Sequence, residues 1–138
     1  MLFQLWTGQP HRSTLGVDLL GSGDDNVDRL VKLFTDVCSQ PVEDDGLTFV
    51  PDSIQGDLIR EDQRYGGIRI QMTAVLDNAR ISIQIDIGFG DAITPKAEQV
   101  KYPTLLDQAA PILRAYPMVT TVAEKYEGWD CGRKRAWR

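Results

Sequence analysis

A hairpin of two alternating segments is the feature that most constrains the fold of this chain. Apolar and polar side chains alternate through "GIRIQMTAVL", residues 67–76, and again through "RISIQIDIGF", residues 80–89. The apolar positions are Ile68, Ile70, Met72 and Ala74 in the first segment and Ile81, Ile83, Ile85, Ile87 and Phe89 in the second. A period of two places these side chains on one face of a strand, and Asp77-Asn78 between the segments is typical of a tight turn. We therefore predict two antiparallel strands with one apolar face.

A third strand is predicted near the N-terminus. In "TLGVDLL", residues 14–20, the apolar side chains of Leu15, Val17 and Leu19 alternate with Gly16 and Asp18. This alternation places Asp18 on the face that points away from the core.

Helices are predicted on either side of the hairpin. Residues 26–38, "NVDRLVKLFTDVC", carry apolar side chains at i, i+3 and i+4 intervals, which indicates an amphipathic helix. We expect the acids of the preceding turn, Asp24 and Asp25, to cap it. A second helix is expected over residues 117–127, with Pro117 in its first turn. "MLFQLW" has helical spacing, and residues 42–62 read as loop and short strands. The predicted class is α+β, with a mixed or antiparallel central sheet and flanking helices.

Length and charge limit the organisation of the chain. Its 138 residues suffice for one domain with a core. Residues 128–138 hold four basic residues and one acid, a net charge of +3, so residues 1–127 carry −8 of the total of −5. We predict a domain over residues 1–127 followed by a basic tail over residues 128–138 that is unordered. The acidic body argues against broad, non-specific nucleic-acid binding, which depends on phosphate neutralisation.

Cysteine usage and hydropathy indicate the compartment. Cys38 and Cys131 lie far apart and lack metal-ligand spacing, so we expect free thiols in a reducing compartment. The N-terminus lacks the basic and apolar regions of a signal peptide, and no run approaches the length of a membrane span. A cytoplasmic protein is expected.

Most catalytic patterns find no support in the sequence. His11 is the single histidine, and a Ser-His-Asp arrangement needs partners that the spacing does not show. "GSG" before the first long helix could hold a phosphate on helix N-terminal amides. The charges of Asp24 and Asp25 would repel that phosphate, so we favour a helix cap.

Carboxylates on strands are the remaining candidates for chemistry. Asp86 lies in mid-strand between Ile85 and Ile87, where an acid is uncommon. With Asp18 on an adjacent strand it could hold a hard divalent cation such as Mg²⁺. Magnesium held in this way bridges nucleotide phosphates and activates a hydroxyl group for in-line attack. The alternative is that both acids lie on a solvated face or pair with Arg69 or Arg80.

Three segments together resemble a known family. "RSTLGVDLLG" is similar to a strand of the pattern Arg-x-Thr-x-Asp-x-Asp-Leu-Leu-Gly, and "IQIDIGFGDAITP" is similar to the strand of a third acid and its following loop. "YPTLLD" and "LRAYPMVTTVAEKYE" are similar to a later segment that ends in Ala-Glu-Lys. These are motifs of the AbiEii/AbiGii-type nucleotidyltransferase toxins, a branch of the polymerase-β-like nucleotidyltransferase superfamily. The resemblance extends from about residue 1 to Glu127.

The resemblance implies roles for five residues. It makes Asp18 the second acid of an Asp-x-Asp pair and Asp86 the third acid, both ligands of Mg²⁺ or Mn²⁺. Lys125 matches the lysine expected near the nucleotide phosphates. Arg12 and Thr14, which lead into the metal strand, become substrate-binding candidates. Members of the family transfer nucleotides, in some cases onto RNA, and are paired with an antitoxin protein on mobile or defence-related loci.

The chain departs from the family pattern at one ligand and at both ends. Gly16 stands where the family has its first aspartate, and loss of a ligand should weaken metal affinity. The glycine-containing phosphate turn that precedes "MLFQLW" in the family lies outside the sequence, and "GWDCGRKRAWR" after Glu127 does not resemble the family. These departures predict a truncated, partial nucleotidyltransferase fold.

Three functional hypotheses follow. The first is a degenerate nucleotidyltransferase-like domain without robust activity that persists as a binding or interaction module and forms a homodimer or higher oligomer. The second is an active metal-dependent enzyme that modifies RNA or protein with Asp18, Asp86 and Lys125. The third assigns RNA binding to the basic tail, by the charges of Arg133, Lys134, Arg135 and Arg138 and by stacking on Trp129 and Trp137.

Overall fold

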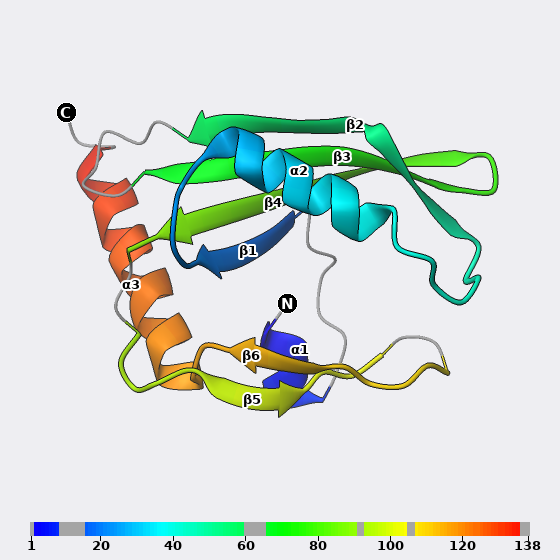
Figure 1. The fold of residues 1–138 in the computed structure, drawn as a ribbon. Coiled ribbons are helices and arrows are strands. Elements are labelled where there is room, and N and C mark those ends of the chain that lie inside the picture. The colour runs from blue at the N-terminus through cyan, green and yellow to red at the C-terminus, as the bar shows by residue number, and fades with distance from the viewer. Residues whose placement is uncertain (1, 9–15, 60–65, 91–92, 105–106, 136–138) are drawn as a thin grey trace. The chain divides into compact units, whose positions relative to one another are not determined.

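The computed structural model describes residues 2–8, 16–59, 66–90, 93–104 and 107–135 (Figure 1). These residues form two compact units, one within Ser13–Asp91 and a smaller one within Met1–Arg12 and Ala92–Arg138. The described elements are α1 (Leu2–Thr7), β1 (Gly16–Gly21), α2 (Val27–Cys38), β2 (Leu47–Ile59), β3 (Gly67–Leu76), β4 (Ala79–Phe89), β5 (Glu98–Lys101), β6 (Ile112–Ala115) and α3 (Met118–Arg135). This content confirms the α+β class.

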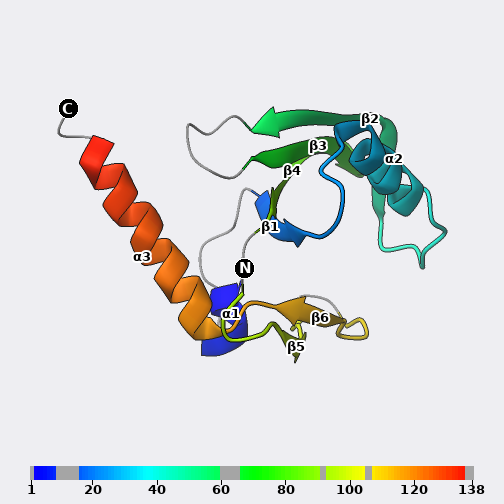
Figure 2. The ribbon, with the colours of Figure 1, turned by 60° about the vertical axis from the view of Figure 1, so that its left-hand side comes forward.

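The larger unit is a mixed sheet with one helix on it. Its strand order is β1-β4-β3-β2, in which β3 pairs antiparallel with both neighbours and β1 pairs parallel with β4. The predicted hairpin is confirmed as β3 and β4, and Asp77 in its turn adopts a positive φ of 52°. Helix α2 lies across one face of this sheet (Figure 1, Figure 2).

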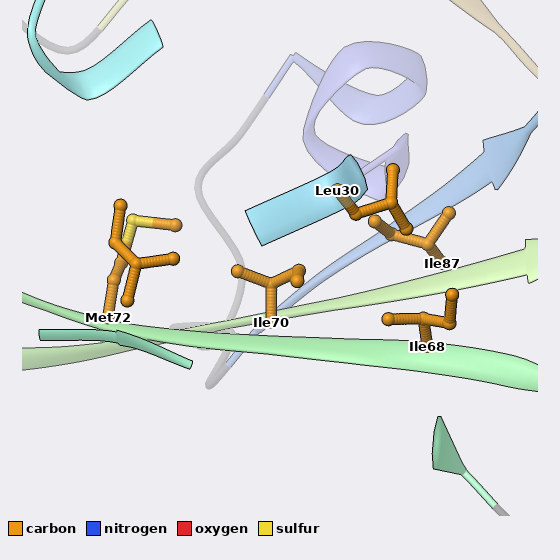
Figure 3. Packing of buried hydrophobic residues seen from close by; sticks show 6 residues of the cluster. Leu30, Ile68, Ile70, Met72 and Ile87 are labelled. Atoms are coloured by element: carbon orange, nitrogen blue, oxygen red, sulfur yellow. The ribbon is translucent and has the colours of Figure 1, made fainter. Parts of the chain in front are cut away.

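The core lies between α2 and the apolar face of the hairpin. Ile68, Ile70 and Met72 of β3 are buried on the same side as Leu30 of α2 (Figure 3). Ile87 of β4 completes the contact with 4% exposure. Burial of such side chains is worth about 1.5–3 kcal/mol each relative to exposure, so this layer is the main stabilising contact of the unit. Ile81, by contrast, is 38% exposed, because the far end of β4 extends beyond the core.

The N-terminal cap of α2 differs from the predicted one. The cap residue is Asn26, whose side-chain oxygen accepts a hydrogen bond from the Arg29 amide at 2.9 Å. Asp24 takes part through its backbone carbonyl, which accepts from Arg29 Nη1. An asparagine caps a helix as well as an aspartate does. Asn26 is the N-cap because it lies directly before Val27, the first residue of α2.

Strand β2 is longer than the short strands predicted for residues 42–62. It extends over Leu47–Ile59, and its pairing with β3 shifts between Val50 and Gln55. Pro51 lies in the shift and has no amide hydrogen to donate. Ser53 bridges the gap, because its hydroxyl donates to the Val50 carbonyl at 2.6 Å and accepts from the Thr73 amide at 2.8 Å. The break in the sequence pattern is therefore an irregularity within one strand.

Cys38 closes α2 as a free thiol. Its Sγ lies 3.7 Å from Met72 Sδ, and partial burial raises the pKa of the thiol. Cys131 falls in the part of α3 whose side chains lie outside the described residues.

The smaller unit holds α1, the antiparallel pair β5–β6 and α3. Strands β5 and β6 were not predicted, since four-residue strands are too short to show a period of two. The predicted helix over residues 117–127 is confirmed as α3, in which Thr120 Oγ1 donates to the Thr94 carbonyl at 3.0 Å. Its backbone continues through Arg135, and the division at residue 127 stays a prediction. Within the described ranges, no helix combines the length and apolarity that a membrane span requires.

We expect Gly56→Ala to destabilise the chain by about 1–3 kcal/mol, the usual cost of overpacking a core. A Cβ atom at this position would lie 2.8 Å from Val27 Cγ1 and 2.9 Å from Val31 Cγ2, so α2 would have to move off the sheet. Urea unfolding measures the change.

The matched control is Gly66→Ala, where a Cβ atom would have no heavy atom within 4 Å. Its free energy of unfolding should change by no more than about 1 kcal/mol in either direction. Equal losses for the two variants would show that contact with α2 is not the cause.

Candidate functional site

The candidate site lies on the sheet face opposite α2, where the register brings charged residues of all four strands of the larger unit into one row. Asp18 of β1 pairs with Asp86 of β4, Asp86 pairs with Arg69 of β3, and Arg69 pairs with Asp57 of β2. Residues paired directly across strands share a face. We call this row, with Gln84 beside it, the polar face. The sheet therefore brings the two predicted acids, Asp18 and Asp86, to adjacent positions.

Asp86 forms a bidentate ion pair with Arg69. Arg69 Nε donates to Asp86 Oδ1 at 2.7 Å, and Arg69 Nη2 donates to Asp86 Oδ2 at 2.8 Å. A planar guanidinium matches a carboxylate in this geometry, which makes it one of the stronger charge-assisted contacts in proteins. The Asp86 side chain is 27% exposed and that of Arg69 is 39% exposed, so water still screens the pair. The pairing with Arg69, one of the alternatives from the sequence, is confirmed.

Gln84 adds a third donor to the same carboxylate. Its Nε2 lies 3.1 Å from Asp86 Oδ2 and 3.3 Å from Oδ1. The hydrogen bonds from Arg69 are the main reason that the pKa of Asp86 lies below its usual value; partial burial opposes the shift, and the Arg69 charge and Gln84 support it. Asp86 is thus held ionised by protein donors.

Gly16 lies directly opposite Gln84 in the parallel pair. A Cβ atom built on Gly16 would lie 3.0 Å from the Gln84 carbonyl oxygen. A side chain here would require the two strands to separate by a few tenths of an ångström. Strands β1 and β4 thus approach more closely at Gly16 than a family-type aspartate would permit without displacement.

The described residues do not fit a paired-metal site. Within the described part of the chain, no group of three or more His, Cys, Asp or Glu side chains is arranged to hold a metal ion. Asp18 is exposed, Gly16 offers no ligand, and both oxygens of Asp86 accept hydrogen bonds from Arg69 and Gln84. Carboxylate oxygens are the donors that Mg²⁺ and Mn²⁺ require, and of the two aligned acids Asp18 and Asp86 only Asp18 offers them without a protein donor in place.

The other predicted site residues are Arg12, Thr14 and Lys125. Arg12 and Thr14 lie outside the described residues. Lys125 lies on α3 in the smaller unit and is exposed. Gln84 and Asp57 were not predicted as site residues. The alternation that places Asp86 on the polar face also places Gln84 there, and that was the available signal for Gln84.

The sheet and its aligned strand acids belong to an α+β domain. Over residues 1–136 the chain matches the family model described as Nucleotidyl transferase AbiEii toxin, Type IV TA system. The match covers nearly the whole chain, so this chain belongs to the AbiEii family of toxins from toxin-antitoxin systems, and the resemblance seen in the sequence is confirmed. The match continues past Glu127, where the resemblance was predicted to end. Comparisons with curated proteins and with solved structures gave no match.

We expect the stabilising effect of the Arg69–Asp86 pair to depend on pH. Since the folded-state pKa of Asp86 is depressed, its contribution is present above the unfolded-state value of about 3.9 and is lost as the pH falls through the lower folded value. Arg69→Met should therefore lower the free energy of unfolding more at about pH 7 than at about pH 3. Urea unfolding at both pH values measures the difference.

Arg80→Met is the matched control, because Arg80 forms no ion pair with any described residue. Its effect on stability should be small and similar at both pH values. A loss for Arg69→Met that stays constant with pH would contradict the electrostatic origin of the effect.

Proposed function

We propose that this chain is a nucleotidyltransferase-like domain of the AbiEii family that lacks robust nucleotide transfer and acts as a binding or interaction module. The observation that carries this proposal is the state of the acids on the polar face. Asp86 is bound by Arg69 and Gln84, and Gly16 replaces the first acid of the Asp-x-Asp pair.

The chemistry of nucleotide transfer explains why these contacts matter. Transfer by metal-assisted in-line attack relies on carboxylates that hold divalent cations against the phosphates and the attacking hydroxyl group. The negative charge that attracts the cation is reduced twice. Gly16 removes one carboxylate, and Arg69 pairs with another, Asp86. The two departures act in the same direction, which supports loss of transfer.

The alternative is an active nucleotidyltransferase that modifies RNA or protein with Asp18, Asp86 and Lys125 and a single Mg²⁺ or Mn²⁺ ion. One observation favours it: β1 and β4 align Asp18 directly with Asp86. Adjacent carboxylates on parallel strands could share one cation if Arg69 moved aside.

We expect no transfer of radiolabel from any nucleoside triphosphate to total RNA or to protein at high enzyme concentration, with either Mg²⁺ or Mn²⁺. The physical reason is the incomplete ligand set described above. Gel electrophoresis of the acceptors followed by autoradiography measures the transfer.

Asp86→Asn serves as the control for contaminating activity. Label incorporated by the unaltered chain and lost in Asp86→Asn would establish the active alternative. Calorimetric titration with each nucleoside triphosphate separates the outcomes further, because nucleotide binding without transfer would identify a binding module.

An oligomer is the proposed form of the module, and an antitoxin protein, as the toxin-antitoxin family implies, is a further partner. Apolar side chains gather on the exposed surface of α3, where Val119 is 63% and Val122 is 49% exposed. Met118, Ala123 and Tyr126 line the same apolar patch. Exposed patches of this kind commonly mark interaction surfaces.

We expect a dimer or higher oligomer at micromolar concentration, and a shift toward monomer for the Val119→Lys, Val122→Lys double variant, because buried lysines oppose association. Light scattering measures the mass. Val42→Lys, which alters a valine that is 78% exposed outside α3, should leave the mass unchanged. A strictly monomeric unaltered chain would contradict the oligomer.

A further inference from the structure

The poor fit of the polar face to a metal has a specific origin in Arg69. Arg69 lies on β3 directly opposite Asp86 of β4 and Asp57 of β2, and its guanidinium forms an ion pair with Asp86. We propose that Arg69 acts as an internal cation that occupies Asp86 in place of a divalent metal, so that Arg69 determines whether the polar face can bind one. This inference deepens the proposed function, since it names the group that replaces the metal.

The contact geometry supports replacement by Arg69. Both carboxylate oxygens of Asp86 are engaged, one by Nε and one by Nη2, at 2.7 Å and 2.8 Å. A metal would need one of these oxygens in direct contact at about 2.0–2.2 Å, so it would have to break at least one arm of the pair. Gln84 would lose its contact with the carboxylate in the same step.

The charges of the row support it as well. A guanidinium stays protonated at any physiological pH, so Asp86 always faces a positive charge. A divalent cation bound between Asp18 and Asp86 would be repelled by that charge at short range. The carboxylate of Asp57 attracts Arg69 from the opposite side, which helps to keep the guanidinium within the row.

An ordinary structural ion pair leads to a different expectation. A partly exposed pair contributes little to stability, and its loss would leave metal affinity unchanged. If Arg69 excludes the metal, removing its charge must create affinity where the unaltered chain has little. A structural role and a metal-excluding role of Arg69 therefore predict different Mn²⁺ affinities for its variants, whereas they predict the same change in stability.

The experiment titrates the full chain with Mn²⁺ alone, in the absence of nucleotide, and follows free Mn²⁺ by electron paramagnetic resonance. We expect Arg69→Gln to bind Mn²⁺ at least tenfold more tightly than the unaltered chain, a difference of about 1.4 kcal/mol. Adding Asp86→Asn to Arg69→Gln should abolish the gain, which places the metal at Asp86.

Arg69→Lys is the matched variant, because it keeps the positive charge and gives up the two-pronged geometry. Its Mn²⁺ affinity should exceed that of the unaltered chain by no more than about threefold, since the retained charge still repels the cation. A gain in Arg69→Lys equal to that in Arg69→Gln would overturn the proposal, as would an unchanged affinity in Arg69→Gln.

One measurement does not depend on how Arg69→Gln folds. Asp86→Asn as the single substitution should leave the Mn²⁺ affinity equal to that of the unaltered chain, because Arg69 already occupies Asp86 in that chain. Tight binding by the unaltered chain that is lost in Asp86→Asn would overturn the proposal. These titrations contain no nucleotide and no acceptor, so they test the role of Arg69 alone. The proposed lack of activity would be overturned by a different result, a positive transfer assay.

Discussion

The register between β3 and β4 is the constraint on which both the core and the candidate site depend. Ile70, which is fully buried against α2, is the direct neighbour of Arg69, which binds Asp86 on the opposite face. Because successive side chains of a strand point to opposite faces, a slip of one residue would exchange the two sets. The burial of Ile68, Ile70 and Ile87 therefore keeps Arg69 and Asp86 together on the opposite face of the sheet.

The parallel pairing of β1 with β4 adds the second acid without adding to the core. Asp18 is aligned with Asp86 by backbone pairing, while Leu19 on the other face remains 44% exposed. The missing side chain at Gly16 allows β1 to approach the Gln84 carbonyl closely. An aspartate at Gly16 would have to displace the Gln84 carbonyl by a few tenths of an ångström, next to Asp86 in the strand pairing.

Sequence periodicity was sufficient for the parts of the fold that bury a continuous face. The hairpin and α2 were predictable because their apolar positions repeat over ten residues or more. Strands β5 and β6 were missed because four residues carry too few repeats, and β2 was divided because Pro51 and the residues after it interrupt the alternation. Helix α3 was predicted from one face that the structure leaves largely exposed, as Val119 and Val122 show.

The two acids of the candidate site were predictable from the sequence, but their contacts and the presence of Asp57 in the row were not. Alternation placed Asp18 and Asp86 on polar faces, but their alignment depends on the strand order, which no local pattern contains. The pairing of Asp86 with Arg69 rather than Arg80 likewise follows from register, since Arg80 lies opposite Val75 at the far end of the hairpin. Because the core and the polar face occupy opposite sides of the same strands, changes such as Gly16 can alter the chemistry of one side while the other continues to hold the fold.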